Sequence, residues 1–274
     1  MWGAIIGDMV GASFAGKLNH DSRFVPAEHL GGYTVNTLLI TALEEYLTYD
    51  PTPPSGRIAV KLAEREIAGI QKRYLRRNAE LCDPSRRRWL ASAGVRRNIS
   101  EGAFSPVLAL PLALVCSDIE EVTQRAEQTC AYISDCAESR EAAKAAAVII
   151  YSLGHGIDKS ELGEICEPFC GFQPQLPYED IRETLSAGGG TRELIQGAVA
   201  ALIKSYDFDS AVRFAAALGR EPQTICALAG AMAEVCYREM PDGLAEKAMA
   251  KLGIYERGKV KIFMKKILDK NALT

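Results

Sequence analysis

The sequence predicts an all-α protein, and three observations lead to this fold class. Apolar residues recur every three to four positions along most of the chain, the spacing of helices that bury one face. Alternation with a period of two residues, which indicates strands, is absent. A length of 274 residues is enough to bury a large core in one domain. We therefore expect a compact single-domain multi-helix bundle over residues 1–274.

The expected helices follow from local patterns along the chain. An apolar stripe of Leu39, Leu43, Tyr46 and Leu47 follows Thr37, and a second stripe follows Thr224. Alanine and glycine within that second stripe predict a helix at the centre of the bundle, where neighbours approach closely. A capping box at 117–120 predicts the start of another helix. Further helices are expected at 58–77, 108–115, 138–153, 160–166, 178–185, 191–204, 208–218, 244–252 and 260–268.

Composition excludes several classes of partner. The formal net charge is −3, so the chain lacks the global basic signature of a nucleic-acid-binding protein. No apolar run reaches the roughly 18 residues that a membrane span needs. The apolar first segment contains Asp8 and has no basic residues before it, unlike a secretory signal. We expect a cytoplasmic protein.

The eight cysteines are not arranged as a metal site. No C-x-x-C motif occurs, and the three histidines do not lie beside a cysteine pair. Most of the cysteines fall within helical patterns. We expect reduced thiols that pack as small apolar side chains.

Ordered segments carry a resemblance to a known family. They are GDMVGASFA at 7–15, YTVNTL at 33–38, GAFSPVLALP at 102–111, ISDCAE at 133–138, DFDSAVRFAAALGREPQT at 207–224 and AGAMAEVCYREMP at 229–241. In this order and spacing they resemble the ADP-ribosylglycohydrolase family, from Met1 to about Leu252. The resemblance implies the helical fold of that family. It also implies a cleft near Asp8, Thr34, Asn36, Ser105, Glu221, Gln223 and Thr224.

The resemblance also shows where this chain departs from the family. The family carries T-D-D-T at 34–37 and G-G-D-x-D-T at 219–224, and its aspartates hold two Mg²⁺ or Mn²⁺ ions. Such hard cations prefer carboxylate oxygens. The degenerate positions in this chain are Ala15, where the family has glutamate, with Val35, Asn36, Glu221 and Gln223. Because one carboxylate remains among them, we expect no metal site, no cofactor and no confident catalytic residue.

A basic segment is the second candidate site. Nine lysine and arginine residues lie between positions 72 and 97, in a chain with a negative net charge. They are candidates for contact with an anionic partner, since arginine binds carboxylate and phosphate through two hydrogen bonds. A solvated helix face explains the same pattern. The candidates for partner binding are Arg76, Arg77, Arg86, Arg87, Arg88, Arg96 and Arg97, which we expect on the surface.

Three functional hypotheses remain open from the sequence. The first is an inactive homologue that binds an acidic or ADP-ribosylated protein, ADP-ribose or a related nucleotide. The second is an active hydrolase with an altered or single-metal site that uses Asp8 and Glu221. The third is a protein-interaction module without a small-molecule cleft.

Overall fold

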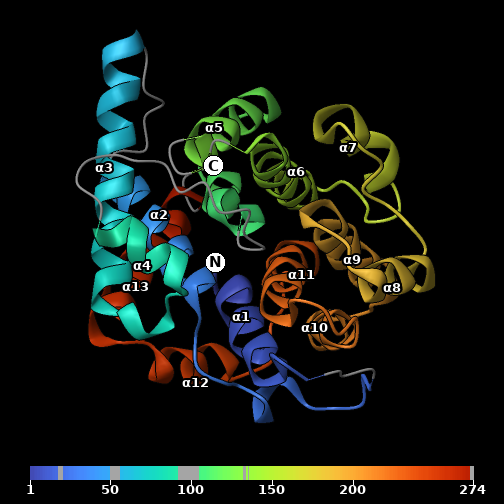
Figure 1. Ribbon diagram of the computed structural model, residues 1–274. Helices are drawn as coiled ribbons and strands as arrows, with labels where there is room; N and C mark the ends of the chain where they lie inside the picture. Colours follow the sequence, from blue (N-terminus) through green and yellow to red (C-terminus); the bar gives the residue numbers. More distant parts are fainter. Residues whose placement is uncertain (18–20, 50–55, 92–104, 132–133, 135, 272–274) are drawn as a thin grey trace.

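A computed structural model describes residues 1–17, 21–49, 56–91, 105–131, 134 and 136–271. Their elements are all helical, and no strand occurs among them (Figure 1). In the first half these are α1 (Trp2–Phe14), η1 (Pro26–Glu28), α2 (Val35–Tyr49), α3 (Gly56–Arg77), η2 (Ala79–Leu81), α4 (Pro84–Ala91), η3 (Ser105–Leu114) and α5 (Ile119–Ala131). In the second half they are α6 (Ala137–Gly154), α7 (Leu162–Cys170), α8 (Tyr178–Ala187), α9 (Thr191–Lys204), α10 (Phe208–Ala216), α11 (Pro222–Tyr237), α12 (Leu244–Lys251) and α13 (Ile254–Asn271). The all-α fold class is confirmed.

Helices α1 and α11 pack against each other near the centre of the bundle (Figure 1). Glycines on α1 make this close approach possible, since a Cβ on Gly7 would overlap the carbonyl oxygen of Cys226. Gly11 likewise lies against the backbone of Pro222, the first residue of α11. The prediction of a buried small-residue helix is therefore confirmed. The contact also fixes the start of α11 beside the end of α1.

The predicted helices are present, and some of them differ from the prediction in helix type or in starting residue. Segment 108–115 was expected to be α-helical but belongs to the 3-10 helix η3, which contains Pro111. Proline has no N–H to donate and clashes with the carbonyl four residues earlier. The last helix begins at Ile254 rather than 260, and Glu256 in its first turn is buried and accepts a hydrogen bond from Asn78 Nδ2 at 3.3 Å. That contact comes from a distant segment, so local periodicity did not indicate it.

The cap before α5 lies one residue from its expected place. Asp118 Oδ1 accepts from the backbone N–H of Glu121 at 2.7 Å, and Glu121 Oε2 accepts from the Ser117 N–H at 2.9 Å. The acidic residue of the cap is thus Glu121 instead of Glu120. The helix therefore begins at Ile119, one residue later than the capping pattern placed it.

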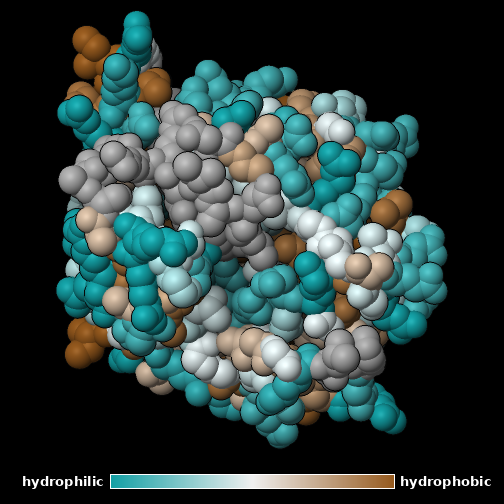
Figure 2. All heavy atoms as spheres, in the orientation of Figure 1, coloured by the Kyte–Doolittle hydropathy of each residue, from teal (hydrophilic) through white to brown (hydrophobic). Residues whose placement is uncertain are grey.

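The start of α3 extends beyond the rest of the bundle (Figure 1). Ile58 and Leu62 in these first turns are 78% and 59% exposed, and apolar side chains are visible there on the surface (Figure 2). The buried face of α3 begins at Ala63. Helix α3 packs against α2.

All eight cysteines are free thiols. Six of them are buried, while Cys136 and Cys236 are partly exposed. Burial raises the pKa of the Cys116 and Cys130 thiols to about 12. These thiols pack as apolar side chains, as the sequence predicted. No helix in the described ranges combines the length and apolar character that a bilayer crossing requires.

Candidate functional site

Asp8 on α1 organises the first turn of α2. Its Oδ1 accepts from Thr34 Oγ1 at 2.5 Å, and its Oδ2 accepts from the Thr34 N–H at 2.8 Å. Oδ2 also accepts from Thr37 Oγ1 at 2.7 Å and from the Thr37 N–H at 3.3 Å. The carboxyl group is fully buried, and this burial raises its pKa against the opposing effect of the four hydrogen bonds. Asp8 therefore serves as an acceptor for the start of α2.

The first turns of α2 and α11 are joined directly. Asn36 Nδ2 donates a hydrogen bond of 3.2 Å to Thr224 Oγ1, and both residues are buried. The Asn36 backbone N–H donates to Thr34 Oγ1 at 3.1 Å. Val35 beside it is 6% exposed and packs in the hydrophobic core. The family has its first aspartate pair at these two positions. In this chain they are occupied by Val35, a core side chain, and by Asn36, whose amide is hydrogen-bonded.

Glu221 stands at the start of α11 in a strained backbone conformation. It is the residue before the helix, with φ of 41° and ψ of 50°, and Pro222 follows it. Left-handed conformations cost free energy for residues other than glycine and cluster at functional sites. Gln223 Nε2 donates to Glu221 Oε2 at 2.8 Å, which holds the carboxylate beside the helix start.

A pocket of about 330 Å³ lies between the end of α1 and the start of α11. Glu221 and Gln223 line it, together with Ala15, Gly16 and Lys17 from the end of α1, and Gly219 and Pro222. Ala15 thus faces the same pocket as the second pair of changed positions. The family has glutamate at this position, whereas Ala15 contributes only a methyl group to the lining of the pocket.

The donor set does not fit a binuclear metal centre. Two divalent cations close together need several carboxylates to offset their repulsion. Both oxygens of Asp8 already accept from Thr34 and Thr37, and Glu221 is the other carboxylate of the predicted cleft. Within the described parts of the chain, no group of three or more His, Cys, Asp and Glu side chains is arranged to hold a metal ion.

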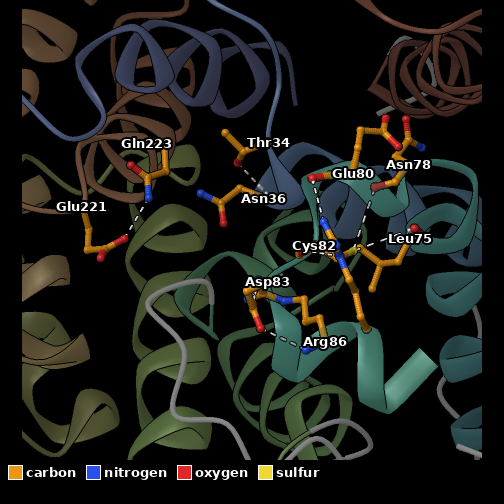
Figure 3. Close-up of polar contacts among 11 residues, drawn as sticks. Thr34, Asn36, Leu75, Asn78, Glu80, Cys82, Asp83, Arg86, Glu221 and Gln223 are labelled. Carbon is orange, nitrogen blue, oxygen red and sulfur yellow. Dashed lines mark hydrogen bonds and ion pairs between the residues drawn. The ribbon is translucent and has the colours of Figure 1, made fainter. Parts of the chain in front are cut away.

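The structure brings together most of the predicted cleft residues. Asp8, Thr34, Asn36 and Thr224 form a continuous chain of hydrogen bonds. Glu221 and Gln223 lie at the same helix start as Thr224 and are hydrogen-bonded to each other (Figure 3). Ser105 begins η3, but its side chain is outside the described part, as are Arg96 and Arg97. Thr37 also belongs to the hydrogen-bonded group, although it was not among the predicted cleft residues, and its hydroxyl donates to Asp8. Its position in the T-x-x-T motif was the available signal.

The basic segment is largely engaged within the molecule. Arg73 forms an ion pair with Glu45 at 2.8 Å, Arg76 donates to the Leu90 carbonyl at 2.9 Å, and Arg77 lies over the Tyr255 ring. Arg87 donates to the Cys82 carbonyl at 2.8 Å but remains exposed, as does Arg88. Several of these cations therefore join helices α2, α3, α4 and α13.

Arg86 corrects one expectation. We expected it on the surface, but its side chain is only 13% exposed and forms an ion pair with Asp83 at 2.6 Å. Burial lowers the pKa of its guanidinium, while the negative charges of Asp83 and Glu221 act in the opposite direction. Asp83 also accepts from the Arg86 backbone N–H at 2.9 Å, because it caps the first turn of α4. Asp83 thus binds both the backbone N–H and the side chain of Arg86, and an acidic residue three positions before Arg86 was the signal for this contact in the sequence.

Comparison with known proteins identifies the family. A search among curated proteins returned no match. The family model for ADP-ribosylglycohydrolase matches residues 1–248, which is most of the chain. The match covers every element that builds the cleft, from α1 through α11. This chain therefore belongs to the ADP-ribosylglycohydrolase family.

Proposed function

We propose that this protein is a catalytically inactive ADP-ribosylglycohydrolase homologue that binds its ligand without hydrolysing it. The ligand is an ADP-ribose-type nucleotide, free or attached to a protein. One observation carries the proposal: the residues that replace the metal-binding aspartates are bonded to one another. Asn36 is bonded to Thr224, and Gln223 is bonded to Glu221. In the family, the side chains at these positions face metal ions. Here Asn36, Glu221 and Gln223 are hydrogen-bonded within the protein instead.

The changed residues also affect how the protein could activate a water molecule for hydrolysis. Hydrolysis in this family relies on metal ions that polarise a water molecule, a role that needs anionic oxygen ligands. Ala15 has no carboxylate to assist, and Val35 has no ligand atom. The scaffold around these positions is retained, which supports a binding function at the same cleft.

An active enzyme with a single-metal site is the alternative. It would use Asp8 and Glu221 as ligands. Asp8 is fully buried, and its four hydrogen bonds hold the start of α2. Recruiting it to a metal would compete with those bonds in a fully buried site. This observation favours the inactive homologue.

A protein partner is the second candidate for what is bound. Arg87 and Arg88 on α4 are exposed, and Arg76 and Arg77 lie on the neighbouring end of α3. An anionic protein surface would be attracted to this region at low salt and less so as salt rises. The double variant Arg87→Glu/Arg88→Glu leaves Arg86 and its ion pair in place. Weaker capture of an ADP-ribosylated protein by this variant at low salt would support the candidate.

Metal binding provides the direct test of the proposal. Calorimetric titration with Mn²⁺ and Mg²⁺ should show no pair of tight sites in the wild-type protein. The variant Ala15→Glu/Val35→Asp/Asn36→Asp/Gln223→Asp restores the family residues on the same scaffold and serves as the comparison. Two equivalents of Mn²⁺ bound with micromolar affinity by the wild-type protein would refute the proposal.

A further inference from the structure

A second pocket lies at the opposite end of α11 from the cleft. Helices α9, α10 and α11 pack against one another, and the pocket forms where α9 leads into α10 and where α11 ends (Figure 1). Its volume is about 510 Å³, a size typical of small-molecule sites. Tyr237, the last residue of α11, lines it, whereas Glu221 precedes the first residue of that helix. A helix of 16 residues is about 24 Å long, so the pocket is separate from the cleft.

The lining of this pocket is acidic. Asp207 and Asp209 line it at the start of α10, and Glu239 and Asp242 line it after the end of α11. The lining that the structure describes includes no lysine, arginine or histidine. Glu239 and Asp242 are exposed, and within the described ranges their carboxylates have no ion pair or hydrogen bond. The pocket therefore presents negative charge that the protein leaves largely uncompensated.

Two of the protein's own cations contact the tyrosines of the pocket. Lys159 Nζ lies 5.3 Å from the centre of the Tyr237 ring and donates to the Tyr237 hydroxyl at 2.9 Å. Arg213 Nη2 donates to the Tyr206 hydroxyl at 3.2 Å. Four carboxylates exceed these two positive charges, so the pocket retains a negative potential that attracts a cation.

One of the carboxylates has an oxygen without a donor. Asp209 Oδ1 is buried and accepts no hydrogen bond from the residues that the structure describes. Burial and the negative charge of Asp207 raise the pKa of the Asp209 carboxyl, and the positive charge of Arg213 acts in the opposite direction. A buried acceptor without a partner is costly. This cost favours a ligand that brings charged N–H donors to Asp209.

The placement of the carboxylates favours an extended organic cation over a metal ion. Among residues whose positions are described, no three His, Cys, Asp or Glu side chains are arranged to hold a metal ion. The carboxylates instead form two pairs on different segments, at the start of α10 and after α11. The rest of the lining is aromatic or apolar and consists of Tyr206, Phe208, Tyr237, Met240 and Pro241. Aromatic faces attract ammonium groups, and methylene groups pack on apolar side chains.

We propose that this pocket binds a linear polyamine, with ammonium groups toward the two pairs of carboxylates and methylene groups on the aromatic rings. A polyamine carries separated positive charges on an apolar chain, which matches this lining. The size of the pocket suits a small molecule, which favours a free polyamine over a basic segment of a protein. The proposal goes beyond the proposed function, because it concerns a different site and a ligand of opposite charge.

Calorimetry at low salt, in the presence of EDTA, tests the proposal with spermidine as the probe. Spermidine should bind to one saturable site, and rising salt should weaken its binding. Butylamine, which has a single ammonium group, should bind at least tenfold more weakly, because it forms fewer charge-assisted hydrogen bonds. Absence of spermidine binding would overturn the proposal. Binding of a tri-lysine peptide without binding of spermidine would also overturn it.

Variants locate the site. Glu239→Gln/Asp242→Asn removes one pair of carboxylates and should weaken spermidine binding tenfold or more, and Asp209→Asn should weaken it about tenfold. Tyr206→Leu should weaken it about twofold to fivefold, the effect of losing an exposed aromatic face. The matched control is Glu120→Gln/Glu127→Gln, which removes the same charge from exposed positions on α5. Helix α5 packs against α6 and η3, so the control should bind spermidine as the wild-type protein does.

Melting temperatures measured without spermidine must first show that the variants fold. If Asp209→Asn unfolds, Glu239→Gln/Asp242→Asn decides, because both of its positions are exposed. Equal spermidine binding by the wild-type protein and this folded double variant would overturn the proposal. An equal loss of binding in the α5 control would overturn it as well, since attraction to the whole acidic protein would then explain the binding. Binding and release of ADP-ribose do not involve this pocket, so the proposed function is tested separately.

Discussion

The side-chain amide of Asn36 donates a 3.2 Å hydrogen bond to Thr224 Oγ1, and this bond joins the starts of α2 and α11. The two residues are 188 positions apart in the sequence. In the family an aspartate stands at the place of Asn36 and faces a metal ion. Here a neutral amide bonded to a hydroxyl replaces a charged group that needs a cation. We therefore expect the stability of the cleft not to depend on a metal ion.

Asn36→Asp tests this relationship. The substitution keeps the shape of the side chain but adds a negative charge at a position that is 3% exposed. We expect a loss of about 1–3 kcal/mol in the free energy of unfolding at pH 7, the typical cost of a poorly compensated buried group. Urea denaturation measures the loss. Adding millimolar Mn²⁺ should not restore stability, and full restoration would show that a metal site is still present.

Removing Asp8 should affect folding rather than a chemical step. Asp8→Ala leaves the hydroxyl and N–H donors of Thr34 and Thr37 without their acceptor. We expect a loss of about 3 kcal/mol or more in the free energy of unfolding, since each buried unpaired donor costs about 1–3 kcal/mol. Asp242→Ala removes an exposed carboxylate and is the matched control, with a change within about 0.5 kcal/mol. Equal urea midpoints for the two variants would contradict the anchoring role of Asp8.

The contact between α1 and α11 leaves no space for a side chain at Gly7. Gly7→Ala would force its Cβ against the Cys226 carbonyl, which is backbone and cannot rotate away. We expect a loss of about 3 kcal/mol or more, at the upper end of overpacking costs. Gly32→Ala is the control, because no described atom lies within 4 Å of the added Cβ. Chemical denaturation gives the free energy of unfolding of both variants, and we expect a large loss for Gly7→Ala only. Similar stabilities of the two variants would show that α1 and α11 can move apart.

The buried thiols should make stability fall at alkaline pH. An unfolded cysteine has a pKa of about 8.5, whereas burial raises the pKa of Cys116 and Cys130 to about 12. A raised pKa means that the folded state favours the protonated thiol. The resulting stability is fully present below about pH 8 and is lost as the pH rises toward about 12. Urea midpoints measured from pH 7 to pH 10.5 should decrease steadily.

Thiol modification provides an independent check at neutral pH. The partly exposed Cys136 should react with Ellman's reagent first, and the buried cysteines should react only when the protein opens. Rapid reaction of Cys116 or Cys130 in the native protein would contradict their burial.

The sequence predicted the helical fold because periodicity and caps are local properties. The stripe at Leu39, Leu43, Tyr46 and Leu47 is buried as expected. The start predicted for the last helix was late: the helix begins at Ile254, and Glu256 in its first turn is hydrogen-bonded to Asn78, a residue far away in the sequence. Local patterns contain no information about such contacts.

The candidate site was predicted only in part, because local sequence patterns do not reveal contacts between distant residues. The changed positions could be read from the family resemblance, and the structure shows what now surrounds Asn36, Glu221 and Gln223. The orientation of Arg86 could not be read in this way. A run of three arginines suggests a solvated face, yet the Arg86 side chain is only 13% exposed and pairs with Asp83, the residue that caps α4.

Release of ADP-ribose tests the central claim most directly. The purified wild-type protein is incubated with ADP-ribosyl-arginine and ADP-ribosyl-serine peptides, with Mn²⁺, with Mg²⁺ and with EDTA, and free ADP-ribose is measured by chromatography. An active member of the family is the positive control. We predict release at the background rate under every condition, because the anionic metal ligands have been replaced. Metal-dependent release above background that is lost in Glu221→Gln would contradict this account and show that the remaining carboxylate supports catalysis.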